Sequence, residues 1–284
     1  MSVKFTTKFL RKKDGTQIFF RFWQGKSDMP VMILLHGLGA HSLRFEKIAN
    51  YYNKKKYNIY AFDFTGFGKS HKFKGHIESF NTYVNETLAM VKLSKIEFPK
   101  NSRFIVGEDI GGVVGLHFAS HYQELITGLI LLSPAARIRH NIQFQKMINA
   151  LINTFFNKFY QYDLPFTKEM LTRDFKMQKE LQHDELDVKT VTAKFYFAML
   201  EAMKKLNRAA LNVTLPVFLL QAENDLLIDV NSVKDLFNNL NSGSKELCVL
   251  KNFYHSLSID KDHELVFQLI DNWINKILFL NDKI

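Results

Sequence analysis

Several residue types and patterns that would place the chain in a special structural class are scarce or absent. Cysteine occurs once, at Cys248, so no disulfide can form within the chain and a reducing compartment is expected. No uncharged apolar run reaches the roughly 20 residues that a membrane-spanning helix needs. The first residues, from Met1 to Phe5, lack the apolar segment of a secretory signal peptide. The sequence therefore predicts a soluble, cytoplasmic protein.

Glycine and proline are also few, whereas apolar residues are plentiful. The chain has 13 glycines and 5 prolines in 284 residues, which leaves no material for a long disordered linker. Hydrophobic residues make up 46% of the chain and include 27 phenylalanines, enough for a large core. This length and composition suit a single large α/β domain with an insertion.

The charge is unbalanced toward positive, with 38 basic against 28 acidic residues and a net charge of +10. Such a charge can attract nucleic acid or an anionic membrane surface. The lysines are scattered along the chain, however, and a binding surface needs them clustered in space. We therefore interpret the charge as a bias of composition and expect no nucleic-acid partner.

Over the first 135 residues, short apolar runs alternate with helical patterns. The runs 5–10 and 17–23 predict two antiparallel strands joined at the turn of Asp14 and Gly15. Further strands are expected at 31–35, 57–62, 103–106 and 126–132, and helices at 43–55, 80–97 and 111–121. Such alternation predicts a mostly parallel sheet with helices on both faces.

The pattern changes between residues 136 and 207, where no strand pattern occurs and helical spacing dominates. Apolar side chains recur there at the three- and four-residue steps of an amphipathic helix: Phe144, Ile148, Leu151, Ile152, Phe155, Phe156 and Phe159. The α/β alternation returns with a strand at 217–221, a helix at 231–239, a strand at 247–250 and a closing helix. We therefore expect an α/β core formed by residues 1–135 and 208–284, and a helical cap formed by residues 136–207.

The expected cap should lie over the carboxyl ends of the strands, because open α/β sheets bind their ligands at that edge. The apolar stripe from Phe144 to Phe159 would then line a tunnel for an acyl chain. Simple packing of the cap on the core is the alternative.

Four short motifs stand at the ends of expected strands. The first, His36-Gly37-Leu38-Gly39, forms a turn that can direct a backbone N–H toward a site. The second runs from Asp63 to Ser70, and its end imitates a phosphate-binding loop. That loop needs glycine at position 63, where this chain has aspartate, so no nucleotide site is expected.

The third motif, Gly107-Glu108-Asp109-Ile110-Gly111, stands at a strand-to-helix junction. It has the pattern of a nucleophile elbow, a strained turn with no space for side chains beside its central residue. Asp109 is therefore the candidate nucleophile, and a glycine-rich turn with a capping aspartate is the alternative. Glu108 is expected to be a structural hydrogen-bonding residue.

Asp225 and His255 form the fourth motif, and each follows an expected strand. The chain order is nucleophile, acid and histidine, and the gap between Asp109 and Asp225 is wide enough to hold the cap. Asp225 and His255 are therefore the candidate acid and base. Asp229, further along the same loop, is the fallback acid.

Together these motifs resemble monoacylglycerol lipases and lysophospholipases of the α/β-hydrolase superfamily, of the serine aminopeptidase S33 type. The similarity covers residues 30–135 and 210–280, whereas the cap agrees only in size and helicity. The resemblance implies Asp225 and His255 as acid and base, and the N–H groups of Leu38 and Ile110 as an oxyanion hole. It implies a lipid or small carboxylic ester as substrate, no cofactor, no metal, and transient contact of the cap with a membrane surface. It leaves the oligomeric state open.

The chain departs from that family at the nucleophile, where Asp109 replaces the family's serine. A carboxylate needs no base to deprotonate it, so His255 would instead activate water. If Asp109 attacked an ester carbonyl, the best leaving group of the adduct would be the aspartate itself. The adduct would mostly collapse backwards, so serine-type ester hydrolysis is not expected.

Three interpretations are compatible with these residues. The first, which we favour, is a lipid-ester hydrolase scaffold whose nucleophile has been replaced. The second is a working aspartate-nucleophile hydrolase similar to haloalkane dehalogenases and epoxide hydrolases, in which a carboxylate attacks a saturated carbon. The third is a non-catalytic ligand-binding protein, which the retention of Asp225 and His255 disfavours.

Two residues disfavour the second interpretation, the aspartate-nucleophile hydrolase. Ile110 stands where dehalogenases have a tryptophan, and Gly39 stands where epoxide hydrolases have a proline. Epoxide hydrolases also use tyrosines of the cap, and this chain offers three there: Tyr160, Tyr162 and Tyr196.

Overall fold

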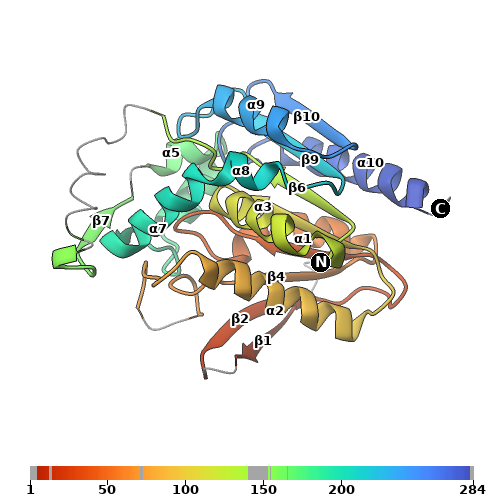
Figure 1. Ribbon diagram of the computed structural model, residues 1–284, viewed down its shortest axis with the longest axis horizontal. Helices are drawn as coiled ribbons and strands as arrows, with labels where there is room; N and C mark the ends of the chain where they lie inside the picture. Colours follow the sequence, from red (N-terminus) through yellow and green to blue (C-terminus); the bar gives the residue numbers. More distant parts are fainter. Residues whose placement is uncertain are drawn as a thin grey trace.

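A large twisted sheet forms the centre of the molecule (Figure 1). The structure is a computed structural model that describes residues 5–12, 15–70, 73–139, 153, 155–164 and 166–281. Within this part of the chain the sheet has eight strands in the order β1-β2-β4-β3-β5-β6-β9-β10. The strands are β1 (Thr6–Arg11), β2 (Gln17–Trp23), β3 (Val31–Leu35), β4 (Asn58–Phe62), β5 (Arg103–Glu108), β6 (Gly128–Leu132), β9 (Val217–Ala222) and β10 (Lys245–Leu250).

The predicted, mostly parallel sheet is confirmed. Strand β2 pairs antiparallel with β1 and with β4, and the other neighbours pair parallel. The expected hairpin between the first two strands is present, with Gly15 at φ 83° in the turn, while Asp14 lies outside the described residues. Strand β3 is apolar and buried throughout because both faces of a parallel sheet are covered.

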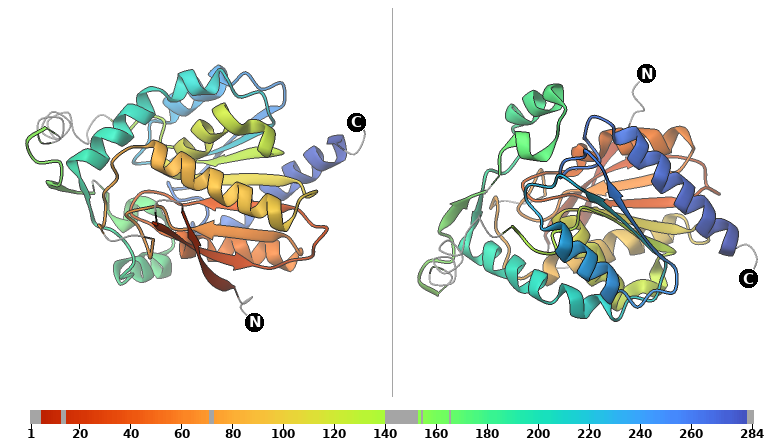
Figure 2. Two further views of the ribbon diagram at one scale, coloured as in Figure 1. Left: turned by 60° about the horizontal axis from the view of Figure 1, so that its bottom comes forward. Right: turned by 90° about the horizontal axis from the view of Figure 1, so that it is seen from above.

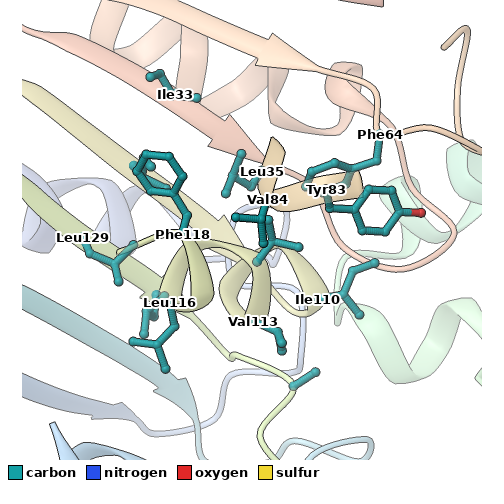
Figure 3. Packing of buried hydrophobic residues seen from close by; sticks show 14 of the residues in the cluster. Ile33, Leu35, Phe64, Tyr83, Val84, Ile110, Val113, Leu116, Phe118 and Leu129 are labelled. Carbon is teal, nitrogen blue, oxygen red and sulfur yellow. The ribbon is translucent and has the colours of Figure 1, made fainter. Parts of the chain in front are cut away.

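Helices cover both faces of the sheet, as the right-hand view of Figure 2 shows for α9 and α10. One face carries α1 (Glu46–Lys54) and α10 (His263–Asn281), and the other carries α2 (Asn81–Glu97), α3 (Ile110–Tyr122), α8 (Leu206–Ala210) and α9 (Val230–Asn239). Alternate residues of each strand enter the two cores: Ile33 and Leu35 face α3, whereas Met32 and Leu34 face α1 and α10. Figure 3 shows Leu35 and Leu129 gathered with the apolar side chains of α3.

The chain between β6 and β9 departs from the sequence prediction. Five of its described elements, β7 (Gln161–Asp163), α5 (Lys168–Leu171), α6 (Phe175–Gln182), β8 (Thr190–Thr192) and α7 (Ala193–Lys204), lie toward one end of the sheet (Figures 1 and 2). The expectation that this region lacks strands is wrong, because β7 and β8 pair antiparallel. Each is three residues long, too short for an alternating pattern to stand out.

The apolar stripe expected to line a tunnel is only partly described. Phe144, Ile148, Leu151 and Ile152 lie outside the described residues. Phe155 and Phe156 are 81% and 86% exposed, and Phe159 is also exposed, so these three side chains line no tunnel. Periodicity identified apolar residues but could not tell which of them face inward. In the described residues, no helix is long and apolar enough to cross a membrane.

Candidate active site

Asp109 stands in a strained turn between β5 and α3. Its backbone has φ 55° and ψ −118°, a left-handed conformation that is uncommon for any residue with a side chain. A Cβ on Gly107 would lie 2.3 Å from the oxygen of Gly111, and a Cβ on Gly111 would lie 2.0 Å from the oxygen of Leu35. The flanking glycines are therefore a steric requirement, and the predicted elbow geometry is present.

The carboxylate of Asp109 lies between a backbone N–H and a histidine. Its Oδ2 accepts a hydrogen bond of 2.8 Å from the N–H of Leu38, and its Oδ1 lies 3.6 Å from Nε2 of His255. Ile110, the other predicted oxyanion donor, is the first residue of α3, where backbone N–H groups lack acceptors within the helix. Oδ2 of Asp109 thus accepts from one of the two predicted oxyanion donors, and Asp109 lies next in sequence to the other.

His36 fixes the direction of the Leu38 N–H. Its Nε2 accepts a hydrogen bond of 3.0 Å from the N–H of Phe64, so its Nδ1 carries the proton and donates to the oxygen of Gly37 at 2.8 Å. That oxygen and the Leu38 N–H belong to one planar peptide group and point in opposite directions. Holding the oxygen therefore aims the N–H at Asp109.

The protonation state of His36 suits this task. Burial lowers its pKa to about 4, against a smaller opposing effect of Asp63, so the ring is neutral at pH 7. A neutral ring can accept from Phe64 and donate to Gly37 at the same time. Sequence reasoning singled out the His-Gly turn but did not assign this role to His36, because it depends on Phe64 of a neighbouring strand end.

Asp225 and His255 meet at the carboxyl ends of β9 and β10. Nδ1 of His255 lies 2.8 Å from Oδ2 of Asp225, and both side chains are buried. The other oxygen of Asp225 accepts the N–H groups of Leu227 and Ile228, each at 2.9 Å, and Oδ2 also accepts from Gln221 at 3.0 Å. These bonds orient the carboxylate toward the histidine.

The fallback acid, Asp229, is not part of this arrangement. Its carboxylate pairs with Arg137 at 2.6 Å and accepts the N–H of Asn231 at the start of α9. Asp229 is therefore a helix-capping residue, and the prediction that it could replace Asp225 is wrong.

Two carboxylates flank one imidazole ring, and this arrangement determines the pKa shifts in the site. Burial alone would lower the pKa of His255, but Asp225 and Asp109 raise it well above its usual value. Burial would likewise raise the pKa of Asp225, but His255 and the backbone N–H groups lower it. Two carboxylates therefore favour the protonated form of one buried imidazole ring.

Glu108, next to the candidate nucleophile, has the structural role expected of it. Its carboxyl accepts hydrogen bonds from the N–H and the hydroxyl of Ser258, at 2.9 and 2.7 Å. Burial raises the pKa of Glu108, and these two bonds oppose that rise. The contact joins the end of β5 to the loop that follows His255.

An apolar pocket opens at Asp109. Leu38 and Ile110 lie beside Asp109 in its lining, and the far wall is formed by β8 and α7. The side chains of that wall include Val191, Phe195, Tyr196 and Met199. The predicted site residues Asp109, Leu38 and Ile110 therefore share one cavity with the region between β6 and β9.

A second, more polar cavity of about 370 Å³ shares Leu38 and Phe166 with the apolar pocket. Near it, His41, Asp184 and Asp187 lie close enough together to hold a metal ion. Asp187, however, already pairs with Arg44 and Lys168, each at 2.6 Å. The carboxylate of Asp187 therefore already has two cationic partners. The cluster connects the loop after β3 to the chain between β6 and β9.

Comparison with known families gives a match over most of the chain. Residues 27–262 match the family described as serine aminopeptidase, S33. The chain belongs to this family. Its membership agrees with the resemblance found in the sequence motifs.

Similar proteins and structures cover nearly the whole chain. Phospholipase YtpA of Bacillus subtilis (strain 168) is 26% identical over an alignment of 258 residues, which covers 87% of this chain and 96% of that protein. Human monoglyceride lipase is 24% identical over an alignment of 276 residues, which covers 93% of this chain and 88% of that protein.

Among solved structures, a soluble variant of monoglyceride lipase from Saccharomyces cerevisiae, in complex with a substrate analogue, has a TM-score of 0.86. It is 19% identical and covers 96% of this chain and 95% of its own. The likeness establishes the α/β-hydrolase fold for this chain.

Proposed function

We propose that this chain is an α/β-fold hydrolase of the lipid-ester class, with residues 136–207 as a cap over a core of residues 1–135 and 208–284. The observation that carries the proposal is the apolar pocket with Asp109 at its base. Relatives named phospholipase and monoglyceride lipase support a ligand with an acyl chain and a polar head. Asp109, Asp225 and His255 are the proposed catalytic residues, and Leu38 and Ile110 the oxyanion donors.

Asp109 prevents the serine mechanism at this site for two reasons. Its Oδ2 accepts the hydrogen bond of the Leu38 N–H, which would otherwise be donated to the tetrahedral intermediate and stabilise it. Its charge also helps to keep His255 protonated, and an imidazolium cannot accept a proton from a nucleophile. The native chain is therefore expected to hydrolyse carboxylic esters poorly.

Replacing Asp109 with serine should create esterase activity. The Asp109→Ser variant frees the Leu38 N–H and removes one carboxylate from His255, which can then act as a base. General base catalysis contributes about 100- to 10,000-fold. We therefore expect Asp109→Ser to hydrolyse medium-chain p-nitrophenyl esters and monoacylglycerols at least about 100-fold faster than Asp109→Ala.

The double variant Asp109→Ser/His255→Ala is the matched control and should fall back to the rate of Asp109→Ala. Circular dichroism and thermal unfolding establish that each variant is folded. A folded Asp109→Ser protein that is no faster than Asp109→Ala on every ester would contradict the lipid-ester hydrolase scaffold.

A second function is favoured by the way Asp109 is held. With Oδ2 bound by Leu38, Oδ1 is the oxygen that can attack a saturated carbon, such as that of an epoxide. Attack breaks the carbon–oxygen bond and leaves an ester on Asp109 and an alkoxide, which takes a proton from the phenol of the half-buried Tyr196 in the pocket wall. Forming the ester removes the charge of Asp109, so the pKa of His255 falls and its ring can activate water.

An isotope experiment tests this second function. In a single turnover of a long-chain terminal epoxide in H₂¹⁸O, water attacks the Cγ of Asp109, so the label should enter Asp109 and the diol should be unlabelled. Mass spectrometry of the Asp109 peptide and of the diol measures both products. Asp109→Asn should form no diol. A labelled diol with an unlabelled Asp109 would rule out the aspartate nucleophile.

We also infer a transient contact between the cap and a membrane surface. Phe155 and Phe156 are almost fully exposed, and nearby Lys158 lies with its Nζ 5.2 Å from the ring centre of Phe159. Changing both exposed phenylalanines to serine should reduce cosedimentation with anionic vesicles about tenfold, because their apolar surface is lost. Ile96→Ser, at an equally exposed site on α2, is the control, and an equal loss there would contradict the assignment.

A further inference from the structure

The apolar pocket has a charge opposite to that of the chain. The sequence carries a net charge of +10, yet the described lining of the pocket contains no lysine, arginine or histidine. The charged groups in that lining are two carboxylates, Asp109 at the base and Asp163 at the exposed end. A ligand in the pocket therefore meets negative charge and apolar surface.

The charge of Asp109 is less fully satisfied than that of its neighbour Asp225. In the described part of the chain, its hydrogen-bond donor is the Leu38 N–H at 2.8 Å, and His255 lies 3.6 Å away, beyond a direct hydrogen bond. Asp225 accepts from Leu227, Ile228 and Gln221 and is 2.8 Å from His255. Two carboxylates therefore face one imidazole ring, so these three groups keep a net negative charge even when the ring is protonated.

We propose that this pocket binds a long-chain primary amine, with its ammonium group on Oδ1 of Asp109 and its alkyl chain along α7. An excess of negative charge in an apolar site is stabilised by a further positive charge, and an ammonium group supplies both that charge and hydrogen-bond donors. Phe195 and Tyr196 offer aromatic faces, which also attract cations. The inference rests on the proposed function in one respect, that the pocket accepts an alkyl chain.

The same arrangement disfavours other head groups. A fatty acid would bring a second carboxylate against Asp109 with no basic side chain in the described lining to offset it. A neutral alcohol would gain the apolar contacts but would leave the second of the two carboxylates around His255 uncompensated. Alkyl ligands of one length should therefore bind in the order amine, alcohol, carboxylate.

Isothermal titration calorimetry of the full chain at pH 7 with n-decylamine, 1-decanol and decanoate tests this order. The amine is protonated at this pH, because its pKa is close to that of a lysine side chain. We expect decylamine to bind at least tenfold more tightly than decanol, a difference of about 1.4 kcal/mol. Decanoate should bind more weakly than decanol. The net positive charge of the chain works against non-specific attraction of the amine.

Variants test whether Asp109 is the residue that makes the pocket prefer the amine to the alcohol. Asp109→Asn should remove the advantage of the amine over the alcohol, measured as the ratio of the two affinities in the same variant, and Asp109→Ser serves the same purpose if Asp109→Asn does not fold. Asp235→Asn, which removes an equal charge on the exposed side of α9, should retain the advantage.

Each other outcome overturns the amine site in a distinguishable way. Decanol that binds as tightly as decylamine removes the charge selectivity but leaves the alkyl pocket of the proposed function intact. Amine selectivity that persists in Asp109→Asn places the cation elsewhere. Failure of all three ligands to bind removes the alkyl pocket as well.

Discussion

The hydrogen bond from the Leu38 N–H to Oδ2 of Asp109 is the interaction on which the account of this site depends. It joins the turn after β3 to the turn after β5, and these two strands are neighbours in the sheet. Leu38 is aimed by His36, and Asp109 is held by a strained turn that its flanking glycines permit. The bond therefore combines features of two separate sequence motifs.

In the proposed function, this bond is the reason that one residue changes the chemistry of the scaffold. The proposed acid Asp225, the histidine and the two proposed backbone donors would serve acyl transfer. We propose that one carboxylate oxygen of residue 109 fills the oxyanion site and that its charge opposes deprotonation of His255. The same features suit attack on a saturated carbon or the binding of a cation, because both use the charge of Asp109 instead of displacing it.

Much of the site could be predicted from the sequence because its residues are local signals. Fully buried parallel strands are continuous apolar runs, and their ends carry the motifs that contain Leu38, Asp109, Asp225 and His255. The role of His36 depends on Phe64, 28 residues away, and no spacing rule indicates such a contact. Choosing between Asp225 and Asp229 likewise needed the structure, because both lie in one loop and only their hydrogen-bond partners separate them.

The region between β6 and β9 was predicted least well. Its strands β7 and β8 are too short for a period to appear, and their pairing joins residues nearly 30 positions apart. The phenylalanine stripe indicated an amphipathic helix, but exposed Phe155 and Phe156 show that apolar spacing does not identify the partner surface. The wall of the pocket comes instead from α7, whose Phe195 and Met199 are buried.

The pKa of His255 tests most directly whether Asp109 acts on the histidine as proposed. NMR titration of the ring protons in the native chain and in folded Asp109→Asn measures it without any assumption about substrate. The account predicts a raised pKa in the native chain and a clear fall in the variant, because one of two neighbouring carboxylates is lost. An unchanged pKa in Asp109→Asn would show that the carboxylate and the imidazole are not paired, and would contradict the account.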